Sequence, residues 1–197
     1  MTLFQLIMLG ISAFFAYQIY QHVQTLQDPA KKDEENGRSK DAFSPFDAEA
    51  LVHKADEAME AGDLQKALAI YKEADIKAPK NPETLFKMGY VLAQQDRDDE
   101  ALEYYQEALS LDEQNTYIHQ ALASLYRKMK AYEKAQEHIK RSLEIDDKNP
   151  ITYFNYGNLL QDMGEKQKAK EMYKKALELD STLDAAKEEL EKLEEMA

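Results

Sequence analysis

The chain has 197 residues, only 6 Gly and 5 Pro, no Cys, and a formal net charge of −13. The lack of Cys excludes disulfides, Cys-ligated zinc and iron–sulfur clusters. The negative charge argues against a nucleic-acid partner, because phosphates require a positive protein surface. Abundant Ala, Leu, Glu, Lys and Gln predict an all-α fold.

Residues 1–27 are predicted to form a transmembrane anchor. Residues 2–27 contain no Asp, Glu, Lys or Arg, and residues 3–20 would span about 27 Å as a helix, close to the hydrocarbon thickness of a bilayer. A cleaved signal peptide would carry basic residues before the apolar run and a small-x-small site after it. The sequence has neither, which favours a retained single-pass helix.

The basic residues that flank the apolar segment predict its orientation. None precedes it, and four follow it closely: Lys31, Lys32, Arg38 and Lys40. Basic residues near a membrane helix stay on the cytoplasmic side. We therefore expect a single-pass membrane protein with its C-terminal body in the cytoplasm.

Residues 28–43 are polar, highly charged and nearly without apolar side chains, which predicts a flexible linker. The body is expected to begin at Ser44, a capping residue followed by Pro45. Residues 184–197 are predicted to form a last helix, with one narrow apolar stripe and a charged opposite face.

From residue 48 the sequence repeats with a period of about 34 residues. The predicted body, 44–183, holds four such units: 48–81, 82–115, 116–149 and 150–183. One position of each unit is always small: Ala55, Gly89, Ala123 and Gly157. Another is always large: Tyr71, Tyr105, Ile139 and Tyr173. A small residue allows two helices to approach closely, and the large residue fills the adjoining space.

The period and these two columns resemble the tetratricopeptide repeat (TPR) family. The resemblance implies a right-handed superhelical solenoid of four helix pairs, in which residues 184–197 are the capping helix. It also implies that the first helix of each pair lines a concave groove. His119 occupies the column of Leu51, Leu85 and Tyr153, so we interpret it as a histidine at the edge of the core.

The groove face implied by the resemblance carries aromatic and polar residues, which are candidates for peptide binding: Phe86, Tyr90, Tyr117, Gln120, Arg127, Phe154 and Asn158. Aromatic side chains on a solvated face suggest an extended or helical ligand, but the same rings could instead pack between repeats. One subset of the family clamps acidic chaperone tails with basic and Asn residues. Only Lys87 is basic among the matching positions, so we expect no such clamp: Val52, Asp56, Lys87, Tyr117 and Ala121.

No catalytic motif, phosphate-binding loop or calcium loop is present in the sequence. We therefore expect no enzyme, no cofactor and no metal site. The predicted function is a membrane-tethered scaffold or adaptor that binds a partner protein, and its architecture resembles that of bacterial inner-membrane assembly factors. Two alternatives stay open: a self-associating structural scaffold, and a periplasm-facing assembly factor for respiratory or cytochrome complexes.

Overall fold

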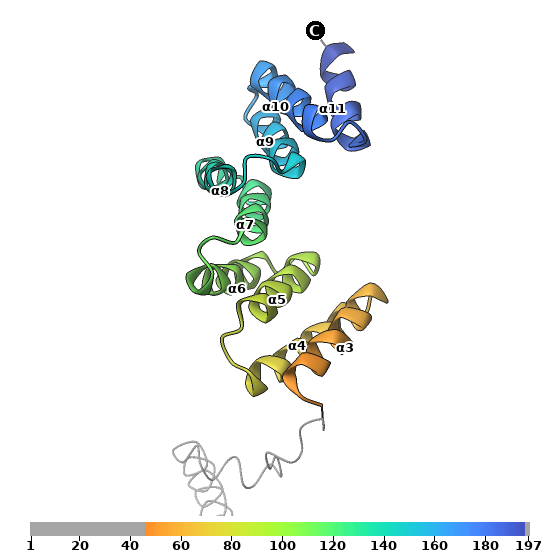
Figure 1. The fold of residues 1–197 in the computed structure, drawn as a ribbon, viewed down its shortest axis with the longest axis vertical. Coiled ribbons are helices and arrows are strands. Elements are labelled where there is room, and N and C mark those ends of the chain that lie inside the picture. The colour runs from red at the N-terminus through yellow and green to blue at the C-terminus, as the bar shows by residue number, and fades with distance from the viewer. Residues whose placement is uncertain (1–45, 196–197) are drawn as a thin grey trace, which may run out of the picture. The chain divides into compact units, whose positions relative to one another are not determined.

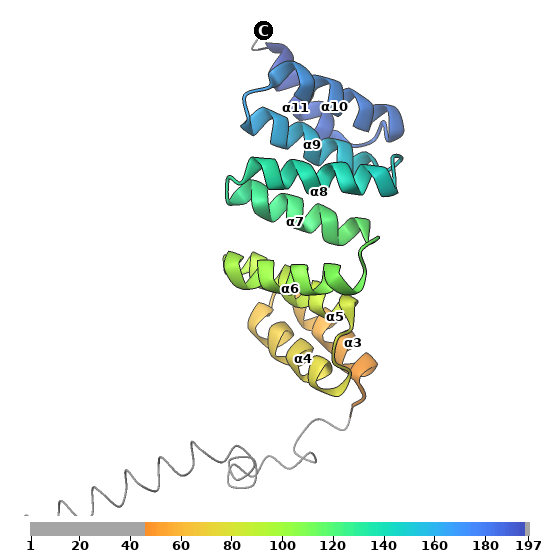
Figure 2. The same cartoon turned by 90° about the vertical axis from the view of Figure 1, so that its left-hand side faces the viewer.

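The computed structural model describes residues 46–195, which form nine α-helices and no strand (Figure 1, Figure 2). The all-α prediction is confirmed for this part of the chain. Eight of the helices form four pairs, and the ninth follows the last pair. The helices are α3 (Ala48–Glu60), α4 (Leu64–Lys77), α5 (Pro82–Gln94), α6 (Asp98–Leu111), α7 (Thr116–Lys128), α8 (Tyr132–Ile145), α9 (Pro150–Asp162), α10 (Lys166–Leu179) and α11 (Asp184–Glu195).

Each pair begins at an Asp or Asn whose side chain caps the first helix. The Asp47 carboxylate accepts a hydrogen bond from the N–H of Ala50 at 2.8 Å. The same cap recurs at the equivalent position of each later pair, at Asn81, Asn115 and Asn149. The first N–H groups of a helix have no intrahelical partner, so these side chains determine where each pair starts.

The two helices of each pair are joined by a turn with one residue in the left-handed backbone region. Gly62 and Gly164 adopt φ angles of 77° and 80°, whereas the equivalent Asp96 and Lys130 adopt 57° and 59°. Glycine reaches this region freely, but a residue with a Cβ does so at a cost of about 1–2 kcal/mol. The second and third turns therefore carry local strain that the first and fourth turns avoid.

The small and large columns of the repeat face each other across each pair. A Cβ atom added to Gly157 would lie 2.4 Å from the Tyr173 ring, and one added to Gly89 would lie 2.7 Å from the Tyr105 ring. Both tyrosines are buried. Glycine is thus required in the second and fourth pairs because the partner ring occupies the space of a side chain.

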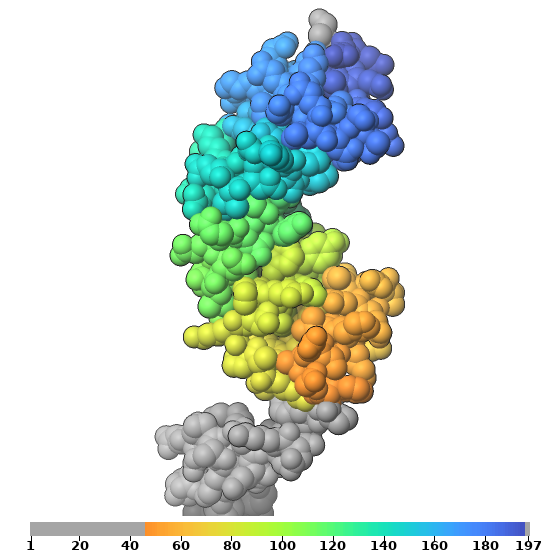
Figure 3. All heavy atoms as spheres, viewed as in Figure 1, coloured from red at the N-terminus to blue at the C-terminus, as the bar shows by residue number. Residues whose placement is uncertain are grey.

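Successive pairs stack through the second helix of one pair and the first helix of the next. The first helices α5, α7 and α9 also contact one another in succession, so their exposed sides form one continuous face. Side chains of successive pairs fill the spaces that the ribbons leave (Figure 3). At the C-terminal end, Leu193 of α11 is buried against Leu160, Ala169 and Tyr173. The last helix therefore covers the apolar end of the fourth pair.

Among residues 46–195, no helix is both long and apolar enough to cross a bilayer. The predicted anchor at residues 1–27 and the predicted linker at residues 28–43 lie outside the described residues. Ser44, where we expected the body to start, also lies outside them. The boundaries of the units and of the linker stay predictions.

Candidate partner-binding surface

The candidate site is the exposed side of the first helices, which we call the first-helix face. It is defined by the seven residues predicted to line the groove. They come from three helices that contact in succession: Phe86 and Tyr90 from α5, Tyr117, Gln120 and Arg127 from α7, and Phe154 and Asn158 from α9.

Two aromatic residues of this face pack against the core. The Phe86 ring lies 5.7 Å from the Tyr105 ring, and the Phe154 ring lies 5.9 Å from the Tyr173 ring, measured between centroids. Both phenylalanines are half-buried. Tilted ring pairs at this distance contribute about 0.5–1.5 kcal/mol beyond their buried area. Phe86 and Phe154 therefore support the packing of their pairs, which was the alternative interpretation of these rings.

The exposed aromatic surface belongs to two tyrosines instead. Tyr90 is 42% exposed and Tyr117 is 68% exposed, and they lie on the neighbouring helices α5 and α7. Ile151 on α9 is also exposed, and it holds the position in the fourth unit that Tyr117 holds in the third. Large exposed apolar side chains of this kind are the usual anchors of a protein interface.

The N-terminal end of the face is acidic, and its one lysine is already engaged. Lys87 Nζ lies 2.9 Å from Asp56 Oδ2 and 2.9 Å from Glu83 Oε1. Asp56 also accepts a hydrogen bond from the Tyr71 hydroxyl. Burial opposes the charged form of Lys87, but its bonds to Asp56 and Glu83 outweigh this and raise its pKa. Lys87 is therefore bound to this chain's own carboxylates rather than presented to an acidic peptide.

The C-terminal end of the face contains a hollow of about 310 Å³, which we call the C-terminal hollow. Arg127 Nη1 lies 2.9 Å from Asp162 Oδ2 at its edge, and the Tyr173 hydroxyl lies 2.8 Å from both Asn158 Oδ1 and Gln161 Oε1. Three of the seven predicted residues meet here. The lining comprises Arg127, Phe154, Asn158, Gln161, Asp162, Ala185, Glu188 and Glu189.

Sequence reasoning missed the contribution of α11 to this hollow. The sequence indicates only that Glu188 lies on the charged face of a capping helix, yet Glu188 and its neighbour Glu189 complete one wall. The lining therefore holds three carboxylates against one guanidinium, so its net charge is negative. A helix that covers the end of a repeat array also borders the face of the last pair. The predicted capping helix could therefore have indicated that residues of α11 line this hollow.

Gln120 occupies the middle of the face, at the place that Phe86 and Phe154 take in their own pairs. Its amide nitrogen is buried and has no hydrogen-bond partner among the described residues. An unpaired buried amide costs about 1–3 kcal/mol. The third pair therefore carries a polar group where its neighbours carry a packed ring.

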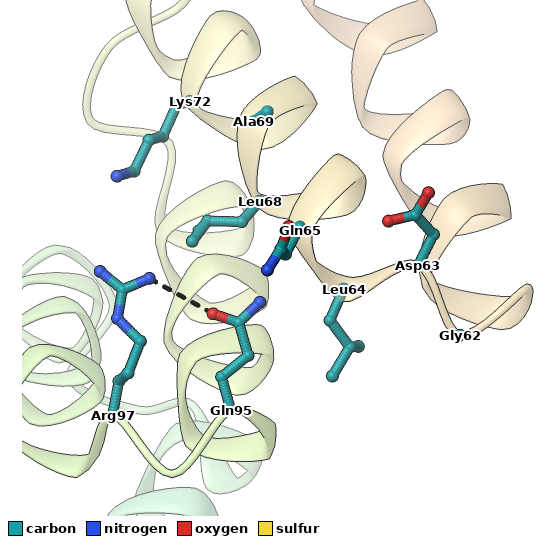
Figure 4. Close-up of a pocket in the computed structure, with 9 residues that line it drawn as sticks. All are labelled: Gly62, Asp63, Leu64, Gln65, Leu68, Ala69, Lys72, Gln95 and Arg97. Atoms are coloured by element: carbon teal, nitrogen blue, oxygen red, sulfur yellow. Dashed lines mark hydrogen bonds between the residues drawn. The ribbon is translucent and has the colours of Figure 1, made fainter.

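A separate hollow of about 760 Å³ lies between α4 and the turn from α5 to α6 (Figure 4). Gln65 and Leu68 face the side chains of Gln95 and Arg97 across it, and Arg97 Nη1 lies 3.3 Å from Gln95 Oε1. Arg97 is also paired with Glu100 at 2.6 Å. This hollow shares no residue with the first-helix face.

The comparisons with known proteins agree with the repeat geometry. One tetratricopeptide repeat model matches residues 58–125, and a second matches residues 115–182. Together they span more than half of the chain. The chain belongs to the tetratricopeptide repeat family. Proteins of this family are in general non-enzymatic scaffolds that bind protein partners. Among curated proteins, none matches this chain.

Solved TPR structures share the fold at low sequence identity. MamA matches with a TM-score of 0.65 and 22% identity over 75% of this chain and 81% of the MamA chain. Pseudomonas aeruginosa PilF matches with a TM-score of 0.69 and 20% identity over 74% and 67% of the two chains. A tetratricopeptide repeat protein from Parabacteroides merdae matches with a TM-score of 0.64 and 27% identity over 75% and 60%.

Proposed function

We propose that this TPR protein is a membrane-tethered scaffold that holds a segment of a partner protein along its first-helix face. The observation that carries the proposal is the contrast among the aromatic residues of that face. Phe86 and Phe154 are packed against the core, whereas Tyr90 and Tyr117 remain exposed on neighbouring helices. Burying such side chains against a partner gains free energy that the isolated chain does not realise.

The charges around these tyrosines indicate the chemistry of the partner segment. Asp56 and Glu83 share the one charge of Lys87 and leave one negative charge in excess at one end. At the other end Asp162 is paired with Arg127 and Glu189 with Lys192, and Glu188 adds a further carboxylate. A segment with apolar side chains at its centre and basic side chains toward its ends would complement this surface. The overall charge of −13 would also speed the approach of a basic partner.

The tether is proposed from the sequence of residues 1–27, which lie outside the described residues. Confinement near the bilayer would raise the effective concentration of the repeats toward membrane partners. A reporter fused to the C-terminus tests the orientation: we expect cytoplasmic activity. Periplasmic activity would contradict this and favour the periplasm-facing assembly factor.

The partner site is tested by replacing the two exposed tyrosines with alanine, Tyr90→Ala and Tyr117→Ala, in the full chain. Partners are crosslinked in membranes, solubilised in detergent and quantified after pull-down. A matched control removes exposed apolar side chains from second helices instead: Ile76→Ala with Leu111→Ala. We expect the tyrosine variant to lose at least tenfold of its captured partner, and the control to lose none.

Circular dichroism and thermal melting of the same variants separate binding from folding. We expect both variants to melt within a few degrees of the wild type, because exposed side chains add little to stability. Equal capture by both variants would contradict the site. Sedimentation at several concentrations tests the remaining alternative, since self-association would appear as a mass that rises with concentration.

A further inference from the structure

Two histidines meet inside the third helix pair, away from the first-helix face. His119 of α7 and His138 of α8 place their Nδ1 atoms 3.0 Å apart. The other three pairs have apolar or aromatic residues at the same two positions: Leu51 with Ile70, Leu85 with Tyr104, and Tyr153 with Met172. The two histidines belong to different helices, so no search along a single helix would find the pair.

This histidine pair departs from the side chains at the same positions of the other three pairs, and hydrogen bonds to both nitrogens of His119 compensate its burial. His119 is 5% exposed, and burial of a polar ring costs free energy unless its nitrogens are bonded. The repeat accommodates apolar side chains at these positions in three of its four copies. Chains depart from their own packing pattern most often where a function requires it.

The hydrogen bonds around His119 define its tautomer. His119 Nε2 lies 3.2 Å from the backbone oxygen of Glu113, which can only accept. Nε2 therefore carries the hydrogen, and Nδ1 presents a lone pair toward His138. Burial lowers the pKa of both imidazoles, so the pair is neutral at neutral pH. A bond from the far nitrogen to a carbonyl is also how proteins orient metal-binding histidines.

The His138 ring is held in place as well. It stacks on Tyr126 with ring centroids 5.6 Å apart and an angle of 13° between the planes. The Tyr126 hydroxyl accepts a hydrogen bond from Gln106 Nε2 at 3.1 Å. The ring centroids of His119 and His138 lie 5.3 Å apart, so the two Nδ1 atoms face each other as in an N–H···N hydrogen bond, and both rings must turn before their lone pairs meet at one ion.

The pair lies at the wall of a hollow of about 430 Å³ between α6, α7 and α8, which gives access to an ion and its water ligands. Glu113 lines the same hollow and could move its carboxylate toward the pair. Arg141 also lines it and pairs with Glu144 at 2.9 Å, yet in addition to burial its positive charge still lowers the pKa of His119. Among residues 46–195, no three His, Asp or Glu side chains are grouped as a metal site. The pair would therefore act with water, or with a repositioned Glu113.

We infer that His119 and His138 together bind a divalent transition-metal ion of the zinc or copper type through their Nδ1 atoms. Two nitrogens bound at about 2.0–2.1 Å lie about 3.3 Å apart in a tetrahedral site and about 2.9 Å apart in a square-planar one. The observed 3.0 Å lies between these values. The ion takes the place of the hydrogen that bridges the two rings, and His138 carries that hydrogen on Nε2 instead.

Bound metal would join α7 to α8 within one pair and hold the third unit rigid. This inference is independent of the proposed partner site, because none of its residues belongs to the first-helix face. Imidazole ligands favour Cu²⁺ over Zn²⁺ in affinity, so both ions are used as probes.

The test adds Cu²⁺ or Zn²⁺ to the full chain and compares three proteins. The pair variant, His119→Leu with His138→Tyr, introduces the residues that the second pair has at these positions. The control, His53→Gln, removes an exposed histidine of α3 that is paired with Glu57. Paramagnetic resonance of Cu²⁺ counts the nitrogen ligands, and calorimetry gives the affinity. We expect two nitrogen ligands in the wild type and control, and at least tenfold weaker binding in the pair variant.

Equal Cu²⁺ affinity in the wild type and the pair variant would overturn the inference. If circular dichroism shows that the pair variant does not fold, His138→Gln replaces it. Nuclear magnetic resonance of the wild type gives an answer without any variant. Zn²⁺ should shift the Nδ1 resonances of His119 and His138 together, and unchanged resonances would sink the proposal.

Discussion

The third and fourth helix pairs build the same backbone from different side chains. In the fourth pair, Gly157 lies against the Tyr173 ring and Phe154 packs on that ring. In the third pair, Ala123, Ile139 and Gln120 occupy the three equivalent positions. The volume lost by the change from tyrosine to isoleucine is partly returned by the change from glycine to alanine.

Between these two pairs, a smaller residue in the large column goes with a larger residue in the small column, although the first pair combines Ala55 with Tyr71. Where the fourth pair fills its interior with rings, the third pair leaves a buried amide at Gln120 and introduces the His119–His138 pair. The interior of the fourth pair therefore contains two packed rings, whereas the third pair has polar side chains at the corresponding places.

The largest predicted change in stability comes from placing single residues of the third pair at the equivalent positions of the fourth pair. Gly157→Ala alone forces a methyl group into the Tyr173 ring and should destabilise the protein by about 1–3 kcal/mol. Tyr173→Ile alone leaves a cavity and should cost about 2–4 kcal/mol. The double variant reproduces the combination of the third pair, so its cost should be smaller than the sum by about 1–2 kcal/mol. Urea denaturation of the four proteins measures this coupling.

Ala123→Gly provides the control for that cycle. The residue opposite Ala123 is Ile139 rather than a tyrosine, so this substitution relieves no contact with a ring. It should lower the free energy of unfolding by about 1 kcal/mol, because glycine has a weaker helix propensity than alanine. Additive effects in the Gly157 and Tyr173 cycle would mean that the two columns do not fill one common space.

Gln120→Met tests the polar group of the third pair at nearly constant volume. Removal of an unpaired buried amide should raise the free energy of unfolding by about 1–2 kcal/mol. Gln106→Met is the matched control, because the Gln106 amide donates to the Tyr126 hydroxyl at 3.1 Å and should lose stability on replacement. A destabilised Gln120→Met protein would show that the amide is satisfied, for example by water.

The sequence predicted the four helix pairs and the facing of small and large columns because both follow from its regular repeat. It could not separate Phe86, which packs on Tyr105, from Tyr90, which is exposed. A period shows which side of a helix a residue occupies, but its exposure depends on the side chains of the neighbouring helix. For the same reason the His119–His138 contact was missed: the repeat places each histidine on its own helix but does not show which side chains meet across the pair.

The turns within the pairs offer a smaller test of the comparison. Lys130 in the third turn has φ of 59°, whereas Gly164 in the fourth has 80°. Lys130→Gly should stabilise the protein by about 0.5–1 kcal/mol, because relief of strain exceeds the added entropy of the unfolded chain. Gly164→Ala should destabilise it by about 1 kcal/mol. Thermal melting of both variants gives the signs, and a loss of stability in Lys130→Gly would contradict the strain in the third turn.

A last effect, which develops only at alkaline pH, distinguishes the two pairs by the titration of one side chain. Burial raises the pKa of Tyr173 above its ordinary value, while Ile139 in the third pair does not titrate. A raised pKa in the folded state means that stability is complete below about pH 10 and falls as the unfolded chain ionises above it. From pH 8 to pH 11 this one tyrosine should remove about 1.4 kcal/mol. Tyr173→Phe should be about 1 kcal/mol less stable than the wild type at pH 7, because the hydroxyl's hydrogen bonding is lost.

The two stability curves should therefore approach each other from pH 9 and cross before pH 11, because the loss of about 1.4 kcal/mol exceeds the initial difference of about 1 kcal/mol. Ile139→Val, which changes no titrating group, should run parallel to the wild type over the same range. Urea midpoints collected at each pH measure the difference between the curves, so the ionisation of other tyrosines and of lysines cancels. Curves that stay parallel for Tyr173→Phe would show that the Tyr173 hydroxyl ionises in the folded protein as readily as in the unfolded chain. The fourth pair would then be open to solvent at its centre, and the contrast with the third pair would rest on shape alone.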